Sequence, residues 1–439
     1  MSHFRGMQEE FLHYFWMQYA HRIKKFQGTS GEQIEVESSG FYNTDSGPDF
    51  FNAKIHIDGI LWCGNVEMHL RSSDWKKHKH HTDSAYNNVI LHVVFRHDAA
   101  AETAHGTEIV TLELQHLISP QHKEKYHQFL WRKQEFPCSD FQKEIPGVFW
   151  RQQFDRALAQ RLERKVKPFQ HDYESTNGDM EEVAYRALAR NFGFRVNALP
   201  FEWLSRNTPY KMVKKVRGNV LHTEALLFGQ SGLLQRRIKD DYVLQLESLY
   251  QKVQEEFSLQ PFEKLQWKFA RMRPLNFPTI RIAQFAMFLH QVEPLSMISD
   301  PNLTLKELRQ LLRVVASDYW NMHYAFARPS KLQPKSMGEA SVDNLIVNTV
   351  VPLMFFNGQT RSWEELTERA LQLLSELKPE RNFVVEKWRR AGFSANGAAD
   401  SQAFLEQWVA WCSGKKCVNC IVGNQILKPS DDQQNSSFF

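Results

Sequence analysis

Residues 47–69 read GPDFFNAKIHIDGILWCGNVEMH and predict a β-hairpin, because two apolar-rich runs flank the turn dipeptide Asp-Gly at 58–59. Two registers fit this segment. A two-residue turn sets Asp49 opposite Met68. A three-residue loop, with its glycine in the left-handed conformation and forming a bulge, sets Asp49 opposite Glu67. We expect the second register, because it brings two carboxylates together.

The hairpin belongs to a strand-rich N-terminal segment. Residues 8–26 predict an amphipathic helix, and runs of period two predict strands at 34–40, 49–57, 60–70, 87–95 and 108–114. The polar stretch 71–88 predicts a loop or a short helix. After residue 120 the period becomes helical, with helices expected around 181–192, 220–236, 241–257, 280–292, 304–318 and 340–355.

Ser362 and Glu365 have the spacing of a capping box for a further helix that runs to about residue 377. The sequence therefore predicts an α/β (α+β) core at 1–125, a large all-α region at 126–428 and a disordered tail at 429–439.

Composition sets limits on function. The chain has 439 residues, of which 42% are hydrophobic and 24% charged, which is ordinary for a globular protein. A net charge of +4 is too small to indicate a nucleic-acid binder by itself. Basic runs at 71–81, 156–167, 211–217 and 264–273 fit either phosphate contacts or solvated helix faces. No run approaches the roughly 20 apolar residues of a membrane span, and we expect a cytoplasmic protein with reduced cysteines.

The hairpin carries groups that suit a metal ion. Glu67 and His69 are two residues apart on one strand and therefore share a face. Asp49 and Glu67 repel each other as anions when they lie across adjacent strands. A divalent cation such as Mg²⁺ or Mn²⁺ removes this repulsion, since carboxylate oxygens are its preferred ligands. Such an ion lowers the pKa of bound water and stabilises a phosphoryl transition state.

Pro-Asp at 48–49 on one strand and Glu-Met-His at 67–69 on the next resemble the motif of the PD-(D/E)XK nuclease superfamily. The resemblance implies a restriction-endonuclease-like core and a nuclease activity. His69 departs from the motif, because it stands where the superfamily usually has lysine. A neutral imidazole can act as a base or as a further ligand. A polar hairpin face without a catalytic role would carry the same residues.

The resemblance also implies roles for particular residues. The metal ligands would be Asp49, Glu67 and the carbonyl of Met68, and Glu10 on the first helix could match the accessory acid. The catalytic set would then be Asp49, Glu67, His69 and Glu10.

A cluster of histidines and aspartates follows the second strand of the hairpin. A single histidine between apolar neighbours is more often a core residue than a ligand. A cluster beside a carboxylate pair can contact phosphates or complete a metal site with nitrogen ligands. The candidates for substrate or metal contacts are Asp74, His78, His80, His81, Asp83 and His92.

Four cysteines form a second candidate metal site. Cys412, Cys417 and Cys420 lie within nine residues, and Cys138 is the candidate fourth ligand. Four thiolates suit Zn²⁺ or a [4Fe-4S] cluster. The pattern resembles the iron–sulfur staple of some RecB-like nucleases, although the order of the gaps and the position of Cys138 differ. Cys63, inside a strand, is expected to be a small core residue.

The chain as a whole resembles a bacterial family of unknown function, DUF2851. The segments that carry this resemblance are SGPDF, GNVEMHLRSSDW, HHTDSAYNNVILHVV, EALLFGQSGLL, RPLNFPTIRIAQ and the cysteine-rich end. The family implies no activity.

The sequence supports three hypotheses. The first is a Mg²⁺- or Mn²⁺-dependent nuclease with a cysteine-bound structural cofactor, acting on DNA or RNA. The second is a non-catalytic nucleic-acid or protein-binding module with a degenerate nuclease core. The third is a metallohydrolase that acts on another substrate through the histidines and aspartates of 74–92. The sequence contains no Walker-type lysine loop or dinucleotide fingerprint.

Overall fold

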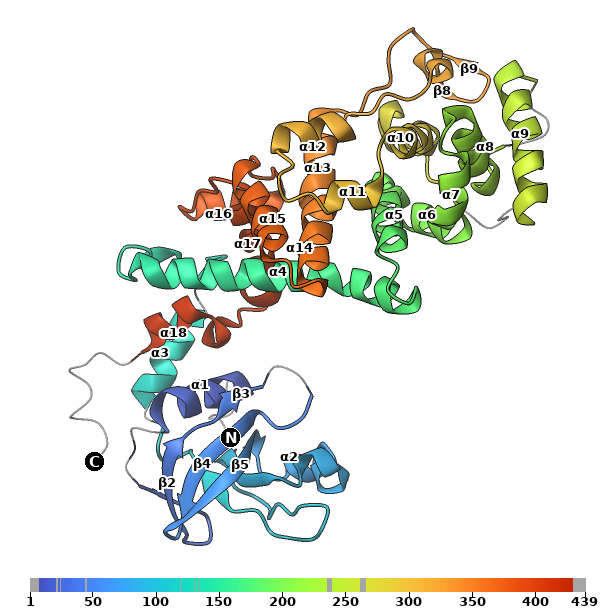
Figure 1. Cartoon of the computed structure of the whole chain (residues 1–439). Coiled ribbons are helices and arrows are strands. Elements are labelled where there is room, and N and C mark those ends of the chain that lie inside the picture. The colour runs from blue at the N-terminus through green and yellow to red at the C-terminus, as the bar shows by residue number, and fades with distance from the viewer. Residues whose placement is uncertain are drawn as a thin grey trace. The chain divides into compact units, whose positions relative to one another are not determined.

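The computed structural model describes residues 8–20, 23, 25–43, 46–118, 120–130, 132, 134–234, 239–260 and 266–428. The chain forms two compact units (Figure 1). Unit 1 combines residues 1–156 with 406–439, and unit 2 comprises residues 157–405. The predicted limit at residue 125 lies inside a helix (Pro120–Leu130), and the contacts extend unit 1 to residue 156 and group residues 406–428 with it. The predicted tail, 429–439, lies outside the described residues.

Unit 1 contains a mixed, seven-stranded sheet. Its order is β1-β2-β4-β5-β6-β7, with β3 paired to β4. The pairs from β1 to β5 are antiparallel, whereas β6 and β7 continue the sheet in parallel with β5. The strands are β1 (Phe26–Gln27), β2 (Gln33–Ser38), β3 (Phe41–Tyr42), β4 (Phe50–Ile57), β5 (Ile60–Arg71), β6 (Val89–Arg96) and β7 (Thr111–Glu113).

The hairpin of β4 and β5 has the two-residue turn, and the predicted three-residue loop is wrong. Ile57 pairs with Ile60. Asp58 and Gly59 between them have φ of 49° and 79°. Two central residues with positive φ are the requirement of the type I′ turn, whose twist matches that of the flanking strands.

A β-bulge in β4 then shifts the register by one residue. Ala53 pairs with Gly64, but the next pair is Phe50 with Val66, so β4 contains one residue more than β5 over this interval. Asn52, inside the bulge, has a φ of 54°. Because of the shift, the residue before Phe50 lies opposite the residue after Val66. These two residues are the carboxylates of the predicted site.

Helices and the C-terminal segment complete unit 1. Helix α1 packs against β5, and its buried face includes Phe11, Phe15 and Trp16. The C-terminal segment returns to this unit, where the Lys415 Nζ donates to the Leu130 carbonyl at 2.8 Å. The elements are α1 (Glu9–Tyr19), α2 (Asp74–Lys77), η1 (His80–Thr82), η2 (Ser84–Tyr86), α3 (Pro120–Leu130), η3 (Ser139–Phe141), η7 (Trp408–Cys412), η8 (Cys417–Asn419) and α18 (Ile421–Leu427), with the first part of α4 (Gly147–Ser175) and the end of α17 (Ala398–Gln407).

Unit 2 is almost entirely helical, as the sequence predicts. A short hairpin, β8 (His323–Ala325) with β9 (Arg328–Pro329), interrupts the helices. Besides the rest of α4 and α17, the helices are α5 (Met180–Phe192), α6 (Phe194–Asn207), α7 (Tyr210–Val216), α8 (Val220–Gln230), α9 (Asp241–Phe257), η4 (Pro274–Asn276), α10 (Pro278–Gln291), α11 (Pro294–Ile298), α12 (Leu305–Leu312), η5 (Asp318–Met322), α13 (Glu339–Leu345), η6 (Ile346–Val350), α14 (Val351–Thr360), α15 (Glu364–Glu376) and α16 (Phe383–Arg390).

The predicted capping box at Ser362 is wrong. Helix α15 begins at Glu364, after Trp363, which makes no side-chain cap. Ser362 has a φ of 52°, in the left-handed region, whereas a capping residue is typically extended. None of the described helices is both long and apolar enough to cross a membrane.

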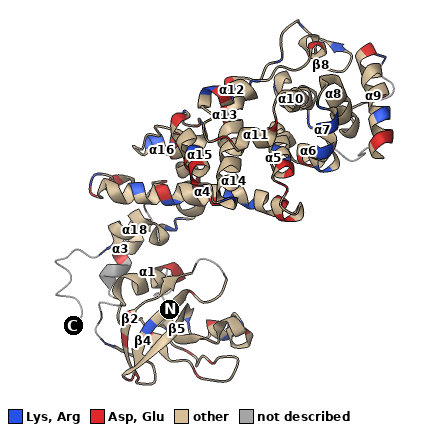
Figure 2. Ribbon diagram, viewed as in Figure 1, with Lys and Arg blue, Asp and Glu red and all other residues tan. Residues whose placement is uncertain are grey.

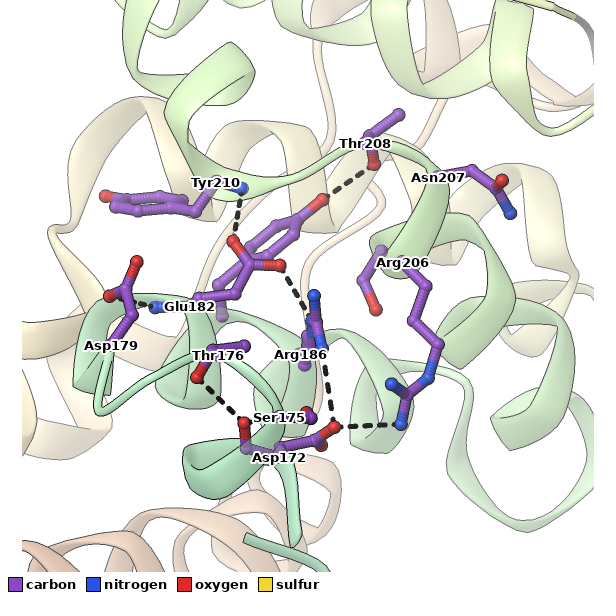
Figure 3. Close-up of polar contacts among 12 residues, drawn as sticks. Asp172, Ser175, Thr176, Asp179, Glu182, Arg186, Arg206, Asn207, Thr208 and Tyr210 are labelled. Carbon is purple, nitrogen blue, oxygen red and sulfur yellow. Dashed lines mark hydrogen bonds and ion pairs between the residues drawn. The ribbon is translucent and has the colours of Figure 1, made fainter.

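A polar network holds the ends of α4, α5, α6 and α7 together in unit 2 (Figure 3). Glu182 accepts from the Arg186 Nε at 2.7 Å and from the backbone N–H of Tyr210 at 2.7 Å. Asp172 pairs with Arg206 at 2.9 Å and with Arg186 at 3.4 Å. Glu182 is buried, and these contacts compensate its charge.

Candidate metal centre

The bulge brings Asp49 and Glu67 together at one end of the hairpin. The backbone N–H of Asp49 donates to Oε2 of Glu67 at 3.0 Å. In turn, the N–H of Met68 donates to Oδ2 of Asp49 at 2.9 Å. Each carboxylate is therefore held by the backbone of the opposite strand. The side chain of Met68 is buried in the apolar layer on the other face of the sheet.

Imidazoles surround the second oxygen of Glu67. Oε1 of Glu67 lies 3.6 Å from Nε2 of His69 and 3.4 Å from Nε2 of His80. The same Nε2 of His69 lies 3.1 Å from Nδ1 of His78, while its Nδ1 lies 2.9 Å from Nε2 of His92. Among the described residues, His69, His78 and His80 are the one group of three metal-ligating side chains whose ligand atoms all lie within 4.8 Å of one another.

Three consecutive parts of the chain position these groups. Glu67 and His69 project from one face of β5, and His92 on β6 is in register with Glu67. His78 and His80 come from the crossover that joins these parallel strands. Lys79 between them has a φ of 64° and reverses the chain, so that both rings approach the ring of His69, with centroids at 5.0 and 5.3 Å.

Burial dominates the electrostatics of this site. It raises the pKa of Glu67 to about 9, and the charge of Asp49 adds to the rise. Burial lowers the pKa of His69 to about 2 and that of His92 to about 3, because charged imidazoles would be desolvated next to one another. The site therefore presents neutral imidazoles, whose nitrogen lone pairs are available as ligands, beside a carboxyl group whose charged form is disfavoured without a cation.

Helix α1 contributes two groups that the sequence analysis did not identify. Nε2 of His13 lies 3.2 Å from Oδ2 of Asp49. Burial and the charge of Asp49 raise the pKa of Glu9, while the nearby His13 lowers it. Both residues share the helix face that points to the sheet, and their i, i+4 spacing was the available signal. Glu10, the predicted accessory acid, lines the same surface depression as Glu9, Leu70 and His78.

Three other predicted residues are not part of this group. Asp74 accepts from the backbone N–H of Arg71 at 3.2 Å at the start of α2. Asp83 caps η2 and accepts from the N–H of Ala85 at 2.9 Å. His81 lies beside His80 in sequence but is not among the ligand atoms that meet. The aspartates therefore stabilise turns of the crossover.

The model of a family described as a protein of unknown function, DUF2851, matches residues 9–383. The chain belongs to the DUF2851 family. The matched range of this DUF2851 chain includes Asp49, Glu67 and all of the histidines described above, and it ends before Cys412. No curated protein and no solved structure matches the chain.

The four predicted cysteine ligands of the DUF2851 chain all belong to unit 1, but their sulfurs do not form a cluster. Burial raises the pKa of each of the four thiols, and each one except Cys420 is raised further by neighbouring thiolates of the group. Nε2 of Gln407 contacts the sulfurs of Cys412 and Cys420 at 3.5 and 3.7 Å. Among these described cysteines, no three sulfurs lie within 4.8 Å of one another. Cys63 is exposed on β5, so its predicted core position is wrong.

Proposed function

We propose that this protein is a metal-dependent phosphodiester hydrolase whose divalent cation is bound between Asp49 and Glu67. The observation that carries the proposal is the pair of hydrogen bonds across the bulged hairpin, in which Glu67 accepts from the N–H of Asp49 and Asp49 accepts from the N–H of Met68. A buried acid next to a second, half-buried acid is unfavourable without a cation, and carboxylate oxygens suit Mg²⁺ or Mn²⁺. The bound ion would supply a water of lowered pKa and would stabilise charge on the phosphoryl group.

In this proposal His69 is a neutral group that binds the ion or positions the attacking water. A pKa of about 2 is far below neutral pH, so its imidazole is a weak general base. Its Nδ1 is held by His92, which fixes the direction of Nε2 toward Glu67. The neutral His69 also favours a second candidate, a non-catalytic nucleic-acid-binding module, because the nuclease motif has a positively charged lysine at this position.

The PD-(D/E)XK relationship in this proposal rests on the motif residues, since no solved structure matches the chain. A mixed sheet brings an Asp and a Glu together across adjacent strands, beside a helix that carries Glu9 and Glu10. We therefore keep the PD-(D/E)XK relationship as part of the proposal, with His69 as its main departure.

A nucleic acid is the proposed partner, and the basic run 71–81 is its best-placed contact. Lys76, Lys77 and Lys79 are exposed next to the candidate metal centre. In the run 211–217, by contrast, acids compensate the cations, as in the pair of Lys214 with Glu181 at 2.9 Å. Figure 2 shows the same interspersion of basic and acidic residues along α4 and α9.

We also propose that Cys138, Cys412, Cys417 and Cys420 bind a structural metal group. Mutually destabilised thiolates, with Gln407 as a hydrogen-bond donor, are a suitable donor set. A single zinc ion holds four sulfurs about 3.8 Å apart, given bonds of about 2.3 Å. The wider spacing of the sulfurs favours a [4Fe-4S] cluster over Zn²⁺.

The activity is tested with the full chain and Mg²⁺ or Mn²⁺ on single- and double-stranded DNA and RNA. Asp49→Asn and Glu67→Gln are expected to lower cleavage by at least about 100-fold, because each removes a charged ligand. Glu35→Gln, an exposed acid on β2, is the matched control and should leave the rate unchanged. Equal cleavage by all three variants would refute the proposal, and binding without turnover by the wild type would select the second candidate.

A further inference from the structure

We propose that His69, His78, His80 and Glu67 form a four-ligand site for one transition-metal ion of the Zn²⁺ class. Glu67 is common to this site and to the proposed cation site with Asp49, and the inference rests on the proposed function only for the role of the ion. Binding itself is independent of turnover.

The distances already approach those of a coordination sphere. Nε2 of His69 and Nδ1 of His78 are 3.1 Å apart, and Oε1 of Glu67 is 3.6 Å from His69 and 3.4 Å from His80. Zinc bonds to nitrogen and oxygen of about 2.0–2.2 Å place tetrahedral ligand atoms about 3.3–3.6 Å apart. The ligand atoms of the three histidines all lie within 4.8 Å of one another, whereas Glu67 is outside that group and must move to complete the site. A bound ion would replace the proton of the hydrogen bond between His69 and His78.

The donor types select the kind of metal. Magnesium prefers oxygen ligands and keeps several waters, so three imidazoles are a poor site for it. Imidazole nitrogen suits Zn²⁺ and neighbouring first-row metals, and one added carboxylate is common in their sites. The site thus predicts a transition metal where the carboxylate pair alone predicted magnesium or manganese.

Contacts behind the ligands keep them in place. His92 on β6 contacts Nδ1 of His69 at 2.9 Å and is fully buried, which orients the other nitrogen of His69 toward the site. Tyr86 packs on the ring of His80 with centroids 3.8 Å apart. Oε2 of Glu67 is fixed by the N–H of Asp49, which leaves Oε1 for the ion.

The site is open on one side. His78 is exposed, unlike His69 and His80, and it lines the depression that also includes Glu9, Asp74 and Lys77. A metal ion can therefore enter from solvent beside His78. The same opening would let water or a substrate reach the bound ion.

The test is metal binding by the full chain, with Zn²⁺, Mn²⁺ and Mg²⁺ each used alone as the probe. The protein is first freed of metal by chelation and dialysis. Elemental analysis should then show one more equivalent of Zn²⁺ in the wild type than in His80→Gln. If both bind this equivalent, calorimetry should show that the wild type binds it at least about tenfold more tightly. His81→Gln is the matched control on the same loop and should behave as the wild type. Equal Zn²⁺ content and affinity in the folded His80→Gln variant would overturn the inference.

X-ray absorption of the Zn²⁺-loaded wild type avoids reliance on variants that fail to fold. A shell of nitrogen and oxygen at about 2.0–2.1 Å supports the site, whereas a shell of sulfur alone at about 2.3 Å contradicts it. The two proposals also fail separately. A bound transition metal without nucleic-acid cleavage removes the proposed activity and keeps this site. Cleavage supported by Mg²⁺, with no nitrogen-bound metal, keeps the proposed activity and removes this site.

Discussion

Asn52 sets the position of Asp49. The left-handed φ of 54° at Asn52 creates the bulge that moves Asp49 one residue along β4, into register with Glu67 on β5. With the observed two-residue turn and an unbroken strand, Asp49 would face the opposite side of the sheet from Glu67. The bulge is thus part of the site, although it makes no contact with the proposed ion.

This relationship predicts the effect of substitutions at the bulge. Asn52→Val should lower the free energy of unfolding by about 1–2 kcal/mol, because a β-branched residue is strained at positive φ. Asn52→Gly should leave it nearly unchanged. Lys54→Val is the control, since it changes an exposed residue of the same strand outside the bulge. Urea denaturation measures all three. Equal stability of Asn52→Val and Asn52→Gly would show that the left-handed conformation does not matter.

A bound cation should stabilise the folded protein through Glu67. At a Zn²⁺ concentration 100 times the Kd, binding adds about 2.7 kcal/mol to the free energy of unfolding. Glu67→Gln should lose most of this gain, since the variant lacks the charged ligand, while its metal-free stability should equal or exceed that of the wild type. Thermal melts with and without Zn²⁺ give both quantities. The same Zn²⁺-dependent gain in the variant would contradict the role of Glu67.

Glu224 in unit 2 predicts a pH dependence that is separate from the metal centre. Burial raises its pKa from 4.5 to about 7, although Ser317 and Tyr242 donate hydrogen bonds to it. Between these two pH values the folded state holds one more proton than the unfolded state. The contribution of Glu224 to the free energy of unfolding is therefore complete below pH 4.5 and is lost as the pH rises through 7.

The expected size of this loss is about 3 kcal/mol, at 1.36 kcal/mol for each pKa unit. Glu224→Gln should show a smaller fall in the free energy of unfolding between pH 5 and pH 8 than the wild type. Glu255→Gln, an exposed acid on α9, should retain the wild-type slope. Denaturant titrations across this range decide the matter, and parallel curves for wild type and Glu224→Gln would exclude a buried proton.

The cysteine group predicts the protection of the C-terminal segment. Cys420→Ser should abolish the iron or zinc bound by the cysteines and should make residues 406–428 sensitive to proteolysis, because the metal group would link them to Cys138. Cys63→Ser is the control, since Cys63 is exposed on β5. Elemental analysis and limited proteolysis after anaerobic purification are the measurements. A Cys420→Ser protein with wild-type metal content and protection would rule out the thiolate site.

The polar network of unit 2 predicts a large effect at Arg186. Arg186→Ala leaves Glu182 and Asp172 without their shared cation, and breaking a buried pair typically costs about 3–5 kcal/mol. Lys214→Ala removes an exposed pair with Glu181 and should change stability by less than about 1 kcal/mol. Urea denaturation measures the free energy of unfolding of the two variants. Similar losses in both would mean that solvent compensates the buried acids.

Patterns that repeat along the chain were predictable. The alternation of apolar residues located β2, β4, β5 and β6 to within a few residues, and Asp-Gly located the turn. The predicted helix at 304–318 was too long, since α12 ends at Leu312, and the segment before η5 is not helical. Apolar residues continue past Leu312, so periodicity alone does not show where this helix ends.

The details of the site depended on contacts that no local pattern contains. A single-residue bulge leaves the alternation around Asn52 almost unchanged, so the two carboxylates were expected to meet through a different turn. His13 and Glu9 approach Asp49 only because α1 packs on β5, a contact between segments distant in sequence. The crossover histidines were predictable as a group, but the reversal at Lys79 that selects His78 and His80 over His81 was not.

The discontinuity of unit 1 imposes an order on biosynthesis. Residues 406–428 pack with the sheet-bearing segment, yet the ribosome must first make the whole of unit 2. Nascent chains therefore expose an incomplete unit 1 until synthesis has passed residue 428. A premature stop shortly after residue 405 would leave every helix wholly within unit 2 intact. It would remove the C-terminal part of unit 1 and would thereby destabilise the N-terminal sheet.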